Sequence, residues 1–220
     1  MIPPLQRIEY GSWQRFEPAM LTEMLSTVAA VNGELLEALA DSARSGDHFF
    51  PLPESLRCCM AILTSSERQV AARCGVFLAD AALADLPGSG LRVEGDLAPL
   101  ADRGRAWLPI EQSISLAHSV LLGSWYLIHA SPAVARVLLG ISAVDVTAYR
   151  ARGVGELAQI ARRHSDWIRP RWPHRLDVWT QILERGSRPV TAEPRSTTLR
   201  CLQVSAGDPA WRSTYVGLLA

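Results

Sequence analysis

Arginine side chains alternate with tryptophan and histidine between residues 162 and 179. The planar guanidinium group binds phosphates and carboxylates through paired hydrogen bonds, and an indole ring stacks on nucleic-acid bases. The mixture predicts a surface for a nucleic acid or another anionic partner. The arginines expected to form it are Arg162, Arg163, Arg169, Arg171 and Arg175. In the alternative interpretation, which we favour for the tryptophans, Trp167, Trp172 and Trp179 anchor the core and the arginines lie at a solvated rim.

Charge is distributed unevenly along this chain of 220 residues. Residues 1–135 hold 9 Arg and 15 Asp or Glu, a net charge of −6, whereas residues 136–220 hold 13 Arg and 7 Asp or Glu, a net charge of +6. The chain has no lysine, which codon bias in a GC-rich genome explains, but such bias does not separate charge along a chain. We expect the basic half either to contact an anionic partner or to form salt bridges with the acidic half.

The segment Pro132–Gly153 has the sequence pattern of a helix-turn-helix. Gly140 permits the left-handed backbone that a tight turn needs, Ile141 fills the angle between the helices, and Ser142 caps the second helix. Val146 is expected to point inward. The residues expected to point outward are Ala143, Asp145, Thr147, Arg150 and Arg152.

Thr147, Arg150 and Arg152 are the side chains of this second helix that suit phosphates and base edges. An ordinary helical hairpin joined by a tight turn has the same pattern, so both interpretations stay open.

The run from about residue 113 to residue 183 resembles the FlhD type of flagellar master-regulator subunit and its relatives on mobile elements. The matching stretches are SLAHSVLLGSWYLIHASPAVARVLLGIS and GVGELAQIARRH. The stretch WIRPRWPHRLDVW resembles an uncharacterised proteobacterial group with an Arg-Pro-Arg-Trp signature. The FlhD resemblance implies an all-helical regulator that acts with a second, FlhC-type subunit to recruit RNA polymerase. About the first 110 residues have no counterpart in that short family.

Catalytic and metal-binding motifs are absent from the sequence. It contains no GxSxG, Walker loop, GxGxxG or HExxH pattern, so we expect neither an enzyme nor a cofactor. The four cysteines, Cys58, Cys59, Cys74 and Cys201, lack the spacing of a zinc site. We expect them to be buried reduced thiols and expect no bound metal.

Apolar periodicity and capping signals predict an all-α fold. Helices are expected over about 19–42, 54–63, 65–74, 110–130, 132–139, 143–152, 154–164 and 174–185, and the short element 76–86 is also expected to be helical. The expected organisation is an N-terminal helical subdomain (1–86), a Gly/Pro-rich connection (87–109), an FlhD-like helical subdomain (110–185) and a loosely structured tail (186–220) docked through Trp211 and Tyr215.

These features together predict two packed helical subdomains, of which the C-terminal one contains the helix-turn-helix-like segment. The expected function is transcriptional regulation, by binding DNA or a transcription complex through the Arg-rich half. The alternative is a non-enzymatic adaptor or scaffold that binds an anionic protein surface, for example a cytosolic component of a bacterial secretion system. We expect a homo- or hetero-oligomer in the cytoplasm, with no membrane segment.

Overall fold

The computed structural model describes residues 18–46, 49–81, 107–187, 198, 201 and 202. The described helices are α1 (Pro18–Ser45), α2 (Arg57–Ile62), α3 (Ser65–Ala72), α4 (Ile110–Ala130), α5 (Pro132–Leu139), α6 (Ala143–Arg150), α7 (Val154–Arg163) and α8 (Leu176–Ser187), with short 3-10 turns η1 (Glu54–Leu56) and η4 (Ser165–Trp167). This part of the chain confirms the all-α prediction. Most of the predicted connection 87–109 and the predicted docking residues of the tail lie outside the described residues.

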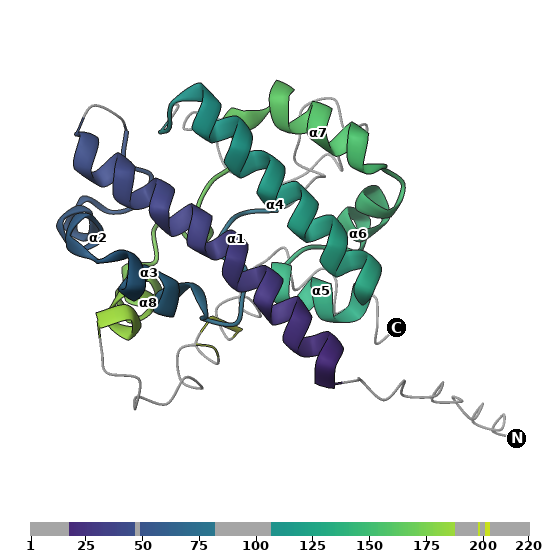
Figure 1. The fold of residues 1–220 in the computed structure, drawn as a ribbon, viewed down its shortest axis with the longest axis horizontal. Helices are drawn as coiled ribbons and strands as arrows, with labels where there is room; N and C mark the ends of the chain where they lie inside the picture. The colour runs from purple at the N-terminus through teal and green to yellow at the C-terminus, as the bar shows by residue number, and fades with distance from the viewer. Residues whose placement is uncertain (1–17, 47–48, 82–106, 188–197, 199–200, 203–220) are drawn as a thin grey trace, which may run out of the picture.

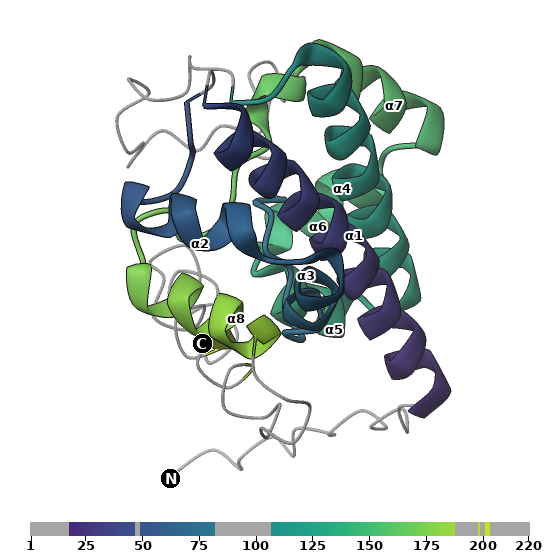
Figure 2. The ribbon, with the colours of Figure 1, turned by 60° about the vertical axis from the view of Figure 1, so that its left-hand side comes forward.

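The two longest helices, α1 and α4, lie side by side and run in opposite directions (Figure 1). Helix α4 packs against α1 on one side and against α5, α6 and α7 on the other. Helices α2 and α3 also pack against α1, and α8 packs against α3 and lies below α2 in the view of Figure 2. Helix α4 is therefore the central element, and it coincides with the helix predicted over about 110–130.

One apolar cluster extends through both predicted subdomains. Leu35 of α1, Leu121 of α4 and Trp179 of α8 all belong to it and have no exposed surface. The acidic and basic halves of the described chain are thus held together by apolar burial, the dominant favourable contribution to folding.

Capping residues and a glycine define several helix ends at the positions that the sequence predicts. Thr64 and Ser142 each close a capping box, with Glu67 and Asp145 respectively, at the starts of α3 and α6. Gly140 ends α5 with φ +65°, a conformation that glycine adopts without strain. Each signal acts within a few residues along the chain, so it can be recognised without knowing the tertiary structure.

The prediction of a helix over 76–86 is wrong for residues 76–81, which form a non-helical, extended segment; all of them except the half-buried Asp80 lie in the core. Gly75, with φ +82°, turns the chain out of the preceding helix. The amide of Phe77 then donates to Leu138 O (2.9 Å), and the amide of Asp80 donates to Arg169 O (2.8 Å). Because distant segments supply these partners, the buried backbone is satisfied without helical hydrogen bonds.

A single side chain of α1, that of Asn32, forms hydrogen bonds with the backbone at the start of this extended segment. Asn32 has no exposed surface, and its Nδ2 donates to Ala72 O (3.0 Å) and Val76 O (2.8 Å). The amide of Leu78 donates to Asn32 Oδ1 (2.8 Å). One carboxamide therefore satisfies three buried backbone groups.

The extended segment lies against a second one that begins after η4. Ala79 forms an isolated antiparallel bridge with Pro170, and the amide of Arg171 donates to Leu78 O (2.7 Å). In the described part of the chain this bridge is the only β-type pairing. It joins the end of the N-terminal half to the segment WIRPRWP.

No single helix among the described residues is long and apolar enough to cross a membrane. Helices α5 and α6 reach the required length and apolarity only as a pair, and they are bent by 119° at their junction.

Candidate nucleic-acid interface

A short turn joins α5 to α6, and the two helices are bent by 119° relative to each other. The 119° between these helices lies at the upper end of the roughly 90–120° typical of that motif. Gly140 is left-handed, and Ile141 is buried in the angle, as the sequence predicts. Ser142 Oγ accepts a hydrogen bond from the amide of Asp145 (3.2 Å) and so caps α6.

Helix α6 exposes a narrow face made of small and apolar side chains with one arginine. Ala143, Val144, Thr147 and Arg150 are exposed, whereas Val146 points into the core as predicted. The Thr147 hydroxyl donates to Ala143 O (3.0 Å) and keeps its acceptor side toward solvent.

The prediction that Asp145 points outward is wrong, because this residue is buried. Its carboxylate accepts hydrogen bonds from the amide of Ser142 (3.0 Å) and from Ser142 Oγ (2.6 Å). The capping box thus turns the acidic group away from solvent and removes it from the exposed face of α6.

The side chain of Arg152 links α6 to α7 and is only slightly exposed. Its guanidinium forms an ion pair with Glu156 (3.2 Å) and donates to Ala148 O (2.8 Å). Its carbonyl oxygen accepts a hydrogen bond from Trp125 Nε1 (3.0 Å). These contacts leave only a small part of Arg152 exposed.

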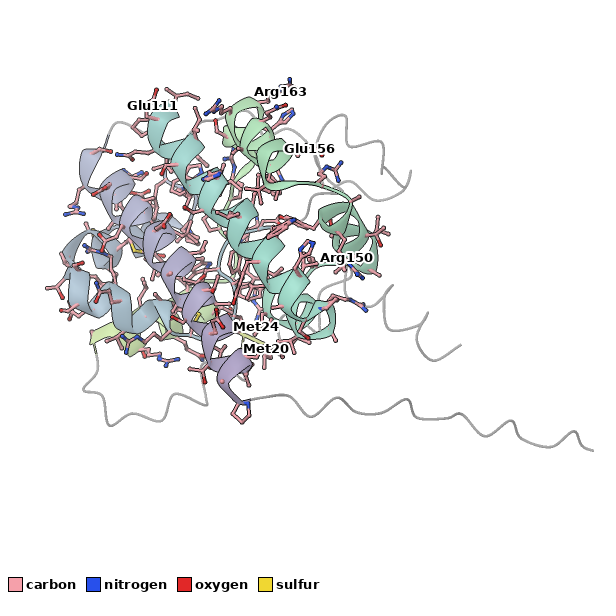
Figure 3. All side chains as sticks on the ribbon, turned by 45° about the vertical axis from the view of Figure 1, so that its right-hand side comes forward. Met20, Met24, Glu111, Arg150, Glu156 and Arg163 are labelled. Atoms are coloured by element: carbon pink, nitrogen blue, oxygen red, sulfur yellow. The ribbon has the colours of Figure 1, made fainter. Side chains whose placement is uncertain are left out.

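Arg162 and Arg163 lie fully on the surface in the last turn of α7. Figure 3 shows Arg163 at the end of α7 and Arg150 at the end of α6, with Glu156 between them in this view. Arg150 belongs to α6 and Arg163 to α7, and α7 alone, with its ten residues, is about 15 Å long. The surface is therefore a sparse set of cations and not a dense basic patch.

The three arginines that follow α7 lie in different environments. Arg171 is buried: its Nη1 donates to Phe77 O (3.1 Å) and its guanidinium stacks on Trp172, 4.2 Å from the ring centroid. Arg169 is half-buried and donates to Ile168 O (3.1 Å). Arg175 is exposed but forms a two-point ion pair with Asp177 (2.8 and 2.9 Å).

The predicted site residues therefore fall into two groups, those that are buried or bonded within the protein and those that are exposed. Arg171 is a structural residue and not a surface contact, and Arg152, Arg169 and Arg175 are engaged within the protein. The members that the fold leaves on the surface for α6 and α7 are Thr147, Arg150, Arg162 and Arg163.

The tryptophans confirm the interpretation as core anchors. Trp179 is fully buried and its Nε1 donates to Arg171 O (3.0 Å). Trp167 and Trp172 are partly buried and pack against the core. The guanidinium–indole contact of Arg171 with Trp172 is the kind expected from that interpretation.

Five ion pairs among the described residues each lie within one half of the chain. Their N–O distances are 2.6–3.2 Å, and each pair joins residues of the same half: Arg44–Asp41, Arg57–Glu54, Arg68–Glu37, Arg152–Glu156 and Arg175–Asp177.

Two buried polar residues, Asn32 and Arg68, are missing from the sequence prediction. Arg68 donates to Leu63 O and pairs with Glu37 (2.6 Å), which fixes α3 to α1. Asn32 has a detectable signal, since it continues the alternating three- and four-residue spacing of Val28, Leu35 and the other apolar residues of α1. A polar residue on such a stripe indicates a buried hydrogen-bonding role.

The prediction that all four cysteines are buried is half wrong, because Cys58 and Cys59 are exposed on α2. Cys74 and Cys201 are buried, and burial raises the pKa of both thiols, that of Cys201 to about 12. Among the described residues no group of three or more His, Cys, Asp or Glu is placed to hold a metal ion.

These thiols predict a loss of stability in alkali. The folded protein keeps Cys201 protonated at pH values where the unfolded chain has lost that proton, so the free energy of unfolding falls as pH rises. For Cys201 the expected fall is about 1.4 kcal/mol per pH unit between about pH 9 and the folded-state pKa of about 12. Urea unfolding across this range measures the slope. Cys201→Ala should make it shallower, and the exposed-site control Cys59→Ala should not; equal slopes in all three proteins would contradict the assignment.

Comparison of the chain with protein-family models, with curated proteins and with solved structures finds no match. The resemblance to FlhD-type regulators therefore stays a prediction from the sequence, and any function rests on the geometry of the site itself.

Proposed function

We propose that this protein is a DNA-binding transcriptional regulator that inserts α6 into the major groove. The observation that carries the proposal is the α5–α6 pair, bent by 119° around a left-handed glycine, with α6 presenting a narrow exposed face. In helix-turn-helix proteins the second helix reads the groove with residues near its N-terminus. The small exposed side chains of α6 would permit a close approach of this helix to the bases.

The chemistry of this face suits a limited direct readout. Val144 and Ala143 would contact thymine methyl groups, and the Thr147 hydroxyl would bond to a base edge. Arg150, Arg162 and Arg163 would contact phosphates and orient the helix. In this proposal the protein acts in the cytoplasm, with the first half of the chain, or an FlhC-type subunit as the resemblance implies, supplying further contacts.

A salt titration of binding to mixed-sequence duplex DNA tests the proposal. Three phosphate contacts predict a slope of log Kobs against log[salt] of about −3, since each neutralised phosphate contributes about −0.9. Arg150→Ala should reduce the magnitude of the slope by about 1, because it removes one contact. Fluorescence anisotropy with labelled DNA measures both quantities.

The matched control is Arg44→Ala, which removes an exposed arginine of the acidic half, far along the chain from α6. It should leave affinity and slope unchanged. Absence of binding at low ionic strength, or an equal loss in Arg44→Ala, would overturn the DNA proposal. Thr147→Val should reduce the difference in affinity between preferred and mixed sequences while leaving the salt slope intact.

A further inference from the structure

An apolar groove lies away from α6 and α7, between α8 on one side and η1, α2 and α3 on the other. Its volume is about 460 Å³. Figure 2 shows α2 and α8 at the same side of the molecule, with α3 to the right of them. The aliphatic residues that line it are Leu56, Ile62, Leu63, Leu176 and Leu183.

Two aliphatic side chains at the opening of this groove are exposed to solvent. Ile62 is 79% exposed and Leu176 is 45% exposed, while Leu56, Leu63 and Leu183 form a buried floor. A single exposed aliphatic residue is ordinary on a protein surface. Two of them beside a concave apolar floor make a continuous surface of the kind that marks an interaction site.

The charged residues that line the groove are acidic. Glu67 and Glu184 line it, and no arginine is among the described residues that line it. The hydrogen bonds from Thr64 hold the pKa of Glu67 below its ordinary value, and this carboxylate, like an ordinary glutamate, is charged at neutral pH. An apolar floor with an anionic rim favours a partner that is apolar along one face and cationic beside it.

We propose that this groove binds an α-helix of a partner protein, with aliphatic residues on the inward face and lysine or arginine beside that face. Helix α8 has twelve residues, about 18 Å of groove wall, which matches three turns of a docked helix. Anchors at positions i, i+3 or i+4, and i+7 would then fill the floor. The inference goes beyond the DNA proposal, because it uses a separate surface.

A designed peptide pair tests the occupant directly. The probe is a helical peptide of about 16 residues with leucine at i, i+3, i+4 and i+7 and lysines at the edges of that face. The second peptide has glutamate in place of every lysine. With the full chain, fluorescence anisotropy should give at least about tenfold tighter binding for the lysine peptide. No binding, or equal binding of the two peptides, would overturn the proposal.

Surface variants then locate the binding. Ile62→Ser and Leu176→Ser should each weaken the lysine peptide by about tenfold or more. The matched control is Ile110→Ser, which removes an aliphatic side chain that is 63% exposed at the start of α4, outside the groove. Glu184→Gln should reduce the preference for lysine over glutamate. An equal loss in Ile110→Ser would place binding elsewhere and overturn the assignment.

Sedimentation of the protein alone separates a partner helix from a second copy of the chain. Self-association that Ile62→Ser abolishes would identify a second copy as the occupant and overturn the proposal of a partner helix. A sedimentation coefficient that does not change with concentration, together with peptide binding, supports it. DNA binding should be unaffected by Ile62→Ser, so the failure of one proposal is distinguishable from the failure of the other.

Discussion

Replacing Asn32 with alanine is expected to lower the free energy of unfolding by about 3–6 kcal/mol. The carboxamide of Asn32 is the partner of Ala72 O, Val76 O and Leu78 N, all in the interior. Each buried polar group that loses its partner costs about 1–3 kcal/mol. Since a domain is stable by only about 5–15 kcal/mol, the variant should be close to unfolding at room temperature, and urea denaturation monitored by circular dichroism measures the loss.

Two companion variants separate hydrogen bonding from packing. Glu34→Ala removes an exposed side chain from the same helix and should change stability by no more than about 0.5 kcal/mol. Asn32→Leu fills the volume of the carboxamide without its hydrogen bonds, so its loss should resemble that of Asn32→Ala. If leucine restored most of the stability, packing and not hydrogen bonding would be the role of Asn32.

Gly140→Ala is expected to cost about 3–5 kcal/mol. Its φ of +65° is unfavourable for an L side chain by about 1–2 kcal/mol. A Cβ at this position would also lie 1.9 Å from Nη2 of Arg171, so the buried guanidinium would have to move away from Phe77 O. Losing a hydrogen bond to a buried charged group costs about 1.5–3 kcal/mol more. Thermal unfolding should show a drop of about 2–4 °C per kcal/mol.

Gly33→Ala is the matched control for this substitution. Gly33 lies within α1 and a Cβ there would meet nothing within 4 Å, so alanine should stabilise the helix by about 0.5–1 kcal/mol. Combining Gly140→Ala with Arg171→Met tests the clash, because the double variant should lose less than the two single losses added together. Strict additivity would mean that the guanidinium does not restrict position 140.

The helices could be predicted because their limits are local. Thr64 with Glu67, Ser142 with Asp145, and Gly140 are signals that act within a few residues, and the structure places a helix end at each. The helical prediction fails at 76–81, where the partners of the backbone come from Asn32, Leu138 and Arg169. Nothing in an apolar run of that length shows that its hydrogen bonds are made elsewhere.

The arginine prediction shows the same limit at the level of side chains. Composition identifies which residues can bind an anion, but burial decides which of them are presented. Arg171 and Arg150 are alike in the sequence, yet one lies against Gly140 and Phe77 O in the interior and the other is exposed on α6. The candidate interface is therefore narrower than the sequence predicts.

The bridge between Ala79 and Pro170 has a consequence for how the chain is made. Phe77 and Arg171, which are bonded across the same contact, are 94 residues apart. At a synthesis rate of about 5–20 residues per second, roughly 5–20 s pass between the emergence of the two segments from the ribosome. During that interval residues 76–81, which are apolar except for Asp80, lack the backbone partners that Leu138 and Arg169 supply, and exposed apolar segments of this kind are prone to aggregation. We therefore expect the delay between the synthesis of the two segments to affect how much of the chain aggregates before it folds.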